Sequence, residues 1–201
     1  MRSLQYAGPA FTSPRSHPWD GAVDDPAARY VDLVAEPAMI RTALEDFVPW
    51  QQHPAIEQFY ALIEWLNGPQ SALMSNDCAF TGPHADHGAA VAKRLGCTGR
   101  VMVLFRDLAR NLDDAALADL TERVHRRLAA RDQSFVWGAV GTTRIAVHFR
   151  TLPGPAAAQR GAQLMLSFWA WGSTEDETLL HLRRVLGNLD RALREATAPA
   201  T

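Results

Sequence analysis

Apolar residues recur every three or four positions in two long stretches of the chain, which is the period of an α-helix that buries one face. Residues 113–131 form one such stretch, and Asp113 stands where it can cap the first turn. Its apolar stripe consists of Leu117, Leu120, Val124 and Leu128. Residues 174–196 form the second, with Leu179, Leu182, Leu186, Leu189 and Leu193 on one stripe. Each stretch predicts one amphipathic helix.

Three further helices are predicted from start and stop signals. Pro37 and Pro54 open residues 37–47 and 54–67, because proline is favoured in the first helical turn. The second of these ends at the Gly-Pro pair of residues 68–69. A short helix over residues 87–95 is predicted to start at the cap Asp86.

Five segments have the character of strands. Residues 71–80 and 100–106 are two of them, and the second is apolar on both faces, as a buried central strand would be. Residues 135–140 and 144–152 predict a hairpin that turns at Gly141-Thr142, with Ile145, Val147 and Phe149 facing inward. Residues 162–171 form the fifth segment, and both of its faces require cover.

The order of these elements predicts an α+β fold. We expect a mixed, mostly antiparallel sheet of four to five strands with helices packed on one side, preceded by an N-terminal arm and two helices. Residues 1–28 contain four prolines and no sustained apolar period, which indicates an extended or partly disordered arm. Residues 29–197 are then a single domain, and residues 198–201 are a tail.

Composition narrows the class of protein. A net charge of −2 over 201 residues provides no basic field, so binding to nucleic acid is disfavoured. No apolar run approaches the roughly 18 residues of a membrane span, and the first residues lack the pattern of a secretory signal. We therefore expect a soluble, cytoplasmic protein with no membrane partner. Lys93 is the only lysine beside many arginines and alanines, which suggests a bacterial source.

The segment 76–87 concentrates the side chains that carry chemistry. The segment contributes Cys78, His84 and His87. Together with Cys97, these residues supply two thiols and two imidazoles, which is the ligand set of a closed zinc site. The spacing does not match the close ligand pairs of structural zinc sites. We therefore favour a polar loop beside two ordinary buried cysteines, and no cofactor, over bound zinc. One disulfide between the cysteines also remains open if the compartment is oxidising.

Two other chemistries are compatible with the same segment. Asp77, His84, Asp86 and His87 form an alternative ligand set for a catalytic divalent metal, which would make the protein a metal-dependent hydrolase. Asp77 and Cys78 are adjacent in the predicted strand, so they point to opposite faces unless a bulge intervenes. The third chemistry uses Cys78 as a nucleophile, with His84 or His148 as its base.

Aromatic residues mark a candidate binding surface. Trp169 and Trp171 share a strand face with Met165, and Trp137 is predicted to stand near them from the hairpin. We expect a non-enzymatic protein- or ligand-binding domain, such as an adaptor or neutralising protein, that binds a protein partner or a second copy of itself. The metal-dependent hydrolase is the alternative.

Overall fold

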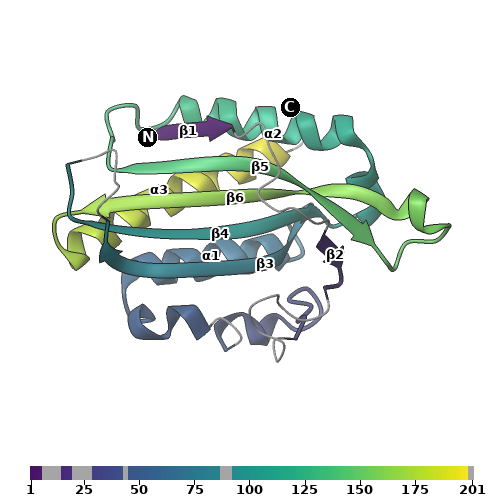
Figure 1. Ribbon diagram of the computed structural model, residues 1–201, viewed down its shortest axis with the longest axis horizontal. Helices are drawn as coiled ribbons and strands as arrows, with labels where there is room; N and C mark the ends of the chain where they lie inside the picture. Colours follow the sequence, from purple (N-terminus) through teal and green to yellow (C-terminus); the bar gives the residue numbers. More distant parts are fainter. Residues whose placement is uncertain (6–14, 20–28, 43–44, 87–91, 199–201) are drawn as a thin grey trace.

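Six strands and three α-helices make up most of the computed structural model (Figure 1), which describes residues 1–5, 15–19, 29–42, 45–86 and 92–198. The strands are β1 (Arg2–Gln5), β2 (Arg15–His17), β3 (Leu73–Ala85), β4 (Leu95–Phe105), β5 (Gly138–Phe149) and β6 (Arg160–Gly172). The α-helices are α1 (Pro54–Asn67), α2 (Asp114–Ala129) and α3 (Glu175–Thr197). Four short 3-10 helices connect them: η1 (Pro37–Arg41), η2 (Glu45–Trp50), η3 (Leu108–Leu112) and η4 (Ala156–Gln159).

The strands form one mixed sheet in the order β1-β5-β6-β4-β3. The four long strands pair antiparallel, whereas β1 and β2 both pair parallel to β5, each along a different part of it. The predicted α+β class is therefore confirmed. The described sheet has six strands instead of four to five, because two short strands come from the segment predicted to be an arm.

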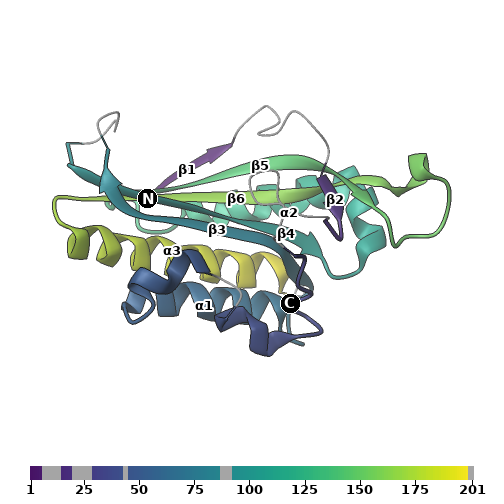
Figure 2. The same ribbon diagram turned by 60° about the horizontal axis from the view of Figure 1, so that its bottom comes forward.

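All three α-helices pack on one face of the sheet: Figure 2 shows α1 and α3 there, and α2 packs against α3 and against β6. Their apolar stripes meet one side of the alternating strands, where for example Phe59 of α1 packs edge-on against Phe168 of β6 with ring centroids 5.1 Å apart. Helix α1 begins at Pro54. The preceding residue, His53, caps the helix, because its side chain accepts a hydrogen bond from the Ala55 amide. The helices predicted over residues 54–67, 113–131 and 174–196 are confirmed to within two residues at each end.

Two local predictions were wrong or only partly right. Gly141 and Thr142 lie inside β5 and pair with Ser167 and Leu166 of β6, so the predicted hairpin is one continuous strand. The chain reverses instead in residues 150–159, where Gly154 takes a φ of 108° that favours glycine. In place of the α-helix predicted over residues 37–47, the structure has the 3-10 helix η1 and the beginning of the 3-10 helix η2.

The predicted strand 71–80 is longer than expected, since β3 runs to Ala85 through two irregularities of register. Of the predicted helix 87–95, residues 87–91 lie outside the described part of the chain, and Leu95 already belongs to β4.

The sheet curls over at one end. Strand β2 is hydrogen-bonded to the C-terminal part of β5, yet its side chains reach β3, which lies three strands away from β5 in the sheet order. In Figure 1 the end of β5 crosses over its neighbours toward β2. This curl covers a second, smaller apolar cluster on the face opposite the helices, formed by Met74, Leu104, Val147 and Phe149. We call the face opposite the helices the open face.

Candidate functional site

The register of the strands places three rows of side chains across the open face. The first row is Asp77, Met102, Met165 and Thr143. The second row is Ala79, Arg100, Ser167 and Gly141. The third row is Thr81, Thr98, Trp169 and Ala139. Within its own row Arg100 therefore has only small neighbours, whereas the rows on either side contain larger side chains such as Met102, Met165 and Trp169.

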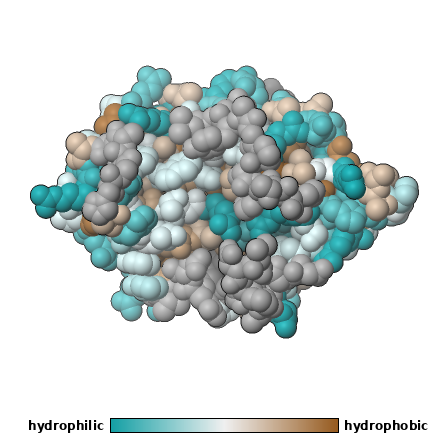
Figure 3. Space-filling view, in the orientation of Figure 1, coloured by the Kyte–Doolittle hydropathy of each residue, from teal (hydrophilic) through white to brown (hydrophobic). Residues whose placement is uncertain are grey.

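This arrangement leaves a hollow around Arg100. The hollow has a volume of about 230 Å³ and is lined by Ala79, Phe80, Thr81, Thr98, Gly99, Arg100, Met165 and Ser167, which we call the open-face hollow. The space-filling view looks onto this face (Figure 3), where pale, weakly polar side chains gather over β4 and β6. Small side chains in the middle of a sheet cannot fill the space above the backbone, so the curled sheet provides a ready concave surface.

Arg100 is held at the edge of the hollow by an ion pair. Its Nη2 lies 3.2 Å from Oδ2 of Asp77, and the same oxygen lies 3.0 Å from Nη1 of Arg15. About a third of the Arg100 side chain, 36%, remains exposed. Its Nε is buried and has no hydrogen-bond acceptor among the described residues. The protein therefore uses only part of the hydrogen-bonding capacity of this guanidinium.

A chain of polar groups joins β2 to β3, and we call this contact the β2–β3 seam. Nδ1 of His17 lies 2.7 Å from Oδ1 of Asn76, whose amide nitrogen donates to Oε1 of Gln163 at 2.8 Å. The indole of Trp19 donates to the Asn76 carbonyl. Burial lowers the pKa of His17, and the hydrogen bond to Asn76 opposes this shift only in part. The imidazole is therefore neutral near pH 7.

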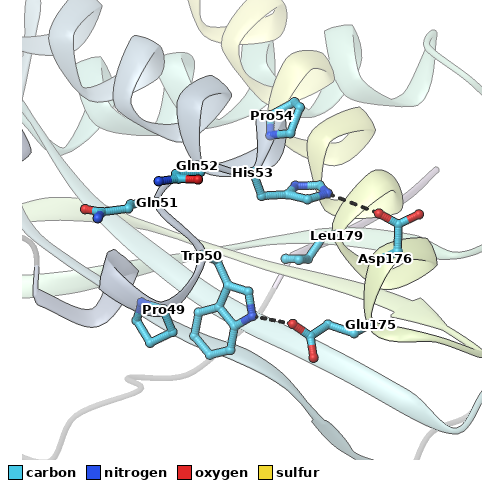
Figure 4. Close-up of a pocket in the computed structure, with 9 residues that line it drawn as sticks. All are labelled: Pro49, Trp50, Gln51, Gln52, His53, Pro54, Glu175, Asp176 and Leu179. Carbon is cyan, nitrogen blue, oxygen red and sulfur yellow. Dashed lines mark hydrogen bonds and ion pairs between the residues drawn. The ribbon is translucent and has the colours of Figure 1, made fainter.

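A larger groove lies between the end of η2 and the start of α3 (Figure 4). Its volume is about 590 Å³, and its lining residues are Pro49, Trp50, Gln51, Gln52, His53, Pro54, Glu175, Asp176 and Leu179, which we call the Trp50 groove.

The polar groups of the Trp50 groove already have structural roles. The Trp50 indole donates to Oε1 of Glu175 at 2.7 Å, and the six-membered ring of Trp50 occupies the space that a Cβ at Gly82 would need. His53 caps α1 and lies 3.6 Å from Asp176. Both carboxylates stand in the first turn of α3, where negative charge favours the helix dipole. We therefore regard the smaller open-face hollow as the stronger candidate for ligand binding.

The structure separates the residues of the predicted zinc set. Cys78 and Cys97 belong to the helix-covered side, where burial raises the pKa of both thiols, that of Cys97 to about 12. His84 pairs with Gly96, which lies on the open face, and its Nδ1 is 2.9 Å from the Gly82 carbonyl. His87 lies outside the described residues. Within the described residues, no cluster of three or more His, Cys, Asp or Glu side chains is arranged to hold a metal ion. The expected absence of a cofactor stays a prediction.

The described members of the alternative metal set, Asp77, His84 and Asp86, are likewise spread along the open face. Asp77 binds Arg15 and Arg100, whereas Asp86, at the far end of β3, accepts a hydrogen bond from the Trp171 indole at 3.0 Å. The register shifts between Ser75 and Asp77, so a bulge lies just before Asp77 and not between Asp77 and Cys78. It leaves Asp77 and Cys78 on opposite faces, so the structure does not bring them together.

The environment of Cys78 also bears on its predicted role as a nucleophile. Its raised pKa keeps the thiol protonated near neutral pH, and its hydrogen-bond partner is Ser75. His84 belongs to the open face, and His148 bonds to Gln159 at 2.9 Å near the β5–β6 connection. The structure therefore does not pair Cys78 with either of these predicted bases.

The structure separates the residues of the predicted aromatic surface from one another. Met165 lines the open-face hollow from the first row, whereas Trp169 stands in the third row, on the other side of Ser167. Trp171 bonds to Asp86 near the end of the sheet. Trp137 packs against the helix-side core, with Nζ of Lys93 4.7 Å from its ring centroid. Part of the predicted surface thus coincides with the hollow.

Sequence analysis missed the residues that create the hollow. Arg100 was interpreted as the first residue of a buried strand, and Ala79 and Ser167 carry no motif. The only available signal was a lone arginine beside an apolar run, because the hollow depends on which residues of three strands stand in one row.

Comparison with known proteins adds no family to this description. No protein-family model matches the chain, and no curated protein or solved structure matches it significantly. In the part of the chain that the structure describes, no helix combines the length and the apolar character of a membrane span.

Proposed function

We propose that the chain is a non-enzymatic binding protein whose ligand occupies the open-face hollow. The observation that carries this proposal is the row Ala79, Arg100, Ser167 and Gly141, in which one partly exposed guanidinium lies among side chains too small to fill the space around it. A concave surface with apolar walls and a few converging polar groups is typical of ligand sites.

The chemistry of the lining supports binding over catalysis. The hollow combines an arginine, three hydroxyl groups and the apolar side chain of Met165, which are groups that position a ligand. Within the described residues, the hydroxyl of Ser167 has no imidazole or carboxylate partner that would activate it. A protein partner or a second copy of the chain would insert a single side chain or terminus here, because the hollow is small.

The proposal includes the cytoplasmic location and the bacterial origin expected from the composition. The free thiols of Cys78 and Cys97 suit a reducing compartment.

A fragment experiment tests the proposed site. Small uncharged amides and alcohols are titrated into isotope-labelled protein, and backbone NMR shifts are followed in the wild type and in Ser167→Leu, which fills the hollow. Ser134→Leu, at an exposed position outside the hollow, is the matched control. We expect saturable shifts in residues 79–81, 98–100 and 165–169 that disappear only in Ser167→Leu. Shifts confined to the Trp50 groove, or shifts that survive in Ser167→Leu, would refute the proposal.

A further inference from the structure

The lining of the open-face hollow contains several hydrogen-bond donors and no carboxylate side chain. Arg100 is the only charged residue in it, and Thr81, Thr98 and Ser167 add hydroxyl groups. Within the described residues, no side-chain hydrogen bond occupies these three hydroxyls. Hydroxyl groups donate as readily as they accept, so all four side chains are able to donate to one anionic group.

The ion pair of Arg100 leaves it able to bind a further anion. Its counter-ion, Asp77, offers the same Oδ2 to Arg15, so the charge of one carboxylate oxygen is divided between two guanidinium groups. The exposed third of the Arg100 side chain is the part that a ligand in the hollow can reach, whereas its buried Nε, which has no acceptor among the described residues, lies beyond that reach. A guanidinium presents five N–H donors in a planar fork that matches the two oxygens of a carboxylate, and such charge-assisted pairs are stronger than neutral hydrogen bonds.

The size and the walls of the hollow limit the rest of the ligand. A volume of about 230 Å³ corresponds to roughly seven or eight water molecules at about 30 Å³ each. Met165 offers an apolar wall and is itself 8% exposed. The space therefore holds a carboxylate and a short apolar group, and excludes a large ring system.

We propose that the ligand of the open-face hollow is a small carboxylate, which binds Arg100 through its carboxyl group and packs a short aliphatic chain against Met165. This inference rests on the proposed function, because it names the ligand class of the same hollow. The carboxylate belongs either to a free aliphatic acid or to the C-terminus of a peptide, since both offer the same chemistry.

The test compares acids with amides of the same shape. Butyrate, butanamide, a short peptide ending in valine and the C-terminal amide of that peptide are each titrated into the labelled protein at constant ionic strength. Of butyrate and the peptide acid, we expect the one that fits the hollow better to bind about tenfold more tightly than its own amide. The backbone NMR signals that shift should be those of residues 79–81, 98–100 and 165–169. Tight binding of butyrate alone identifies a free acid, and tight binding of the peptide acid alone identifies a protein terminus.

Variants test whether the preference for the acid over its amide depends on Arg100. In Arg100→Gln the acid is expected to bind no better than its amide, whereas Arg100→Lys keeps a positive charge and is expected to retain part of the preference. Arg183→Gln removes an exposed arginine from α3 and is the matched control, with unchanged binding of all four probes.

The outcomes distinguish this inference from the proposed function. Equal binding of acid and amide in the hollow overturns the carboxylate inference and leaves the binding site standing. Binding of neither acids nor uncharged fragments in the hollow overturns both. The comparison in the wild type requires no variant, so a misfolded Arg100→Gln would not prevent a decision.

Discussion

Lowering the pH is expected to destabilise the β2–β3 seam through His17. This imidazole is 5% exposed and lies within hydrogen-bonding distance of Asn76, which in turn donates to Gln163. Because Oδ1 of Asn76 is an acceptor, Nδ1 of His17 carries the proton of the neutral ring. A second proton would charge a side chain that burial has removed from water.

The direction and the size of this effect follow from proton linkage. Burial lowers the pKa of His17 in the folded state below its ordinary value, so the unfolded chain binds a proton more readily than the folded protein. Stability is therefore fully present above a pH of about 6.5 and is lost as the pH falls below that value. At pH 5.5 the loss from one histidine is at most about 1.4 kcal/mol, reached when the folded-state pKa lies well below 5.5.

Urea unfolding followed by tryptophan fluorescence measures the effect at pH 7.5 and pH 5.5. We expect the stability lost between these two values to be smaller in His17→Gln than in the wild type by up to about 1.4 kcal/mol. His125→Gln is the comparison variant, because burial also lowers the pKa of His125 and its removal leaves the contribution of His17 unchanged. An equal loss of stability in wild type and His17→Gln would refute the reasoning.

Three further predictions concern packing and metal binding. Gly187→Ala should raise the free energy of unfolding by about 0.5–1 kcal/mol in urea melts, because a Cβ there meets nothing nearer than 3.9 Å and alanine favours a helix. Gly82→Ala should lower it by about 1–3 kcal/mol, since its Cβ would lie 1.9 Å from a ring carbon of Trp50, and an unchanged melt would contradict this packing. Plasma mass spectrometry of untagged protein should find no stoichiometric transition metal; zinc that is lost in both His84→Ala and Cys78→Ser would instead support the metal site.

Local signals were sufficient where one element decides its own structure. The helix α1 was predicted over residues 54–67 because proline opens it, a Gly-Pro pair ends it and an apolar stripe runs between them. The cap Asp113 was predicted correctly for the same reason, and its side chain accepts from the Ala115 amide. These signals act within a few residues of each other, so the sequence contains them in full.

Local signals failed where a distant strand decides the conformation. Gly141-Thr142 has the composition of a turn, but β6 supplies partners on one side of β5 for every residue from Gly138 to His148. The arm was predicted to be extended, yet its attachment as two strands depends on the free edge of β5, which nothing in residues 1–28 encodes.

The sequence by itself determined the α+β class, the three α-helices and the side of each α-helix that is buried, because periodicity and capping are properties of neighbouring residues. Only the tertiary structure decided the candidate site. Ala79, Arg100 and Ser167 come from three strands, and they surround one hollow because the sheet register sets them in a single row. The same register places Cys78 and His84 on opposite faces. Register and curl arise from hydrogen bonds between residues far apart in the chain, so no local pattern records them.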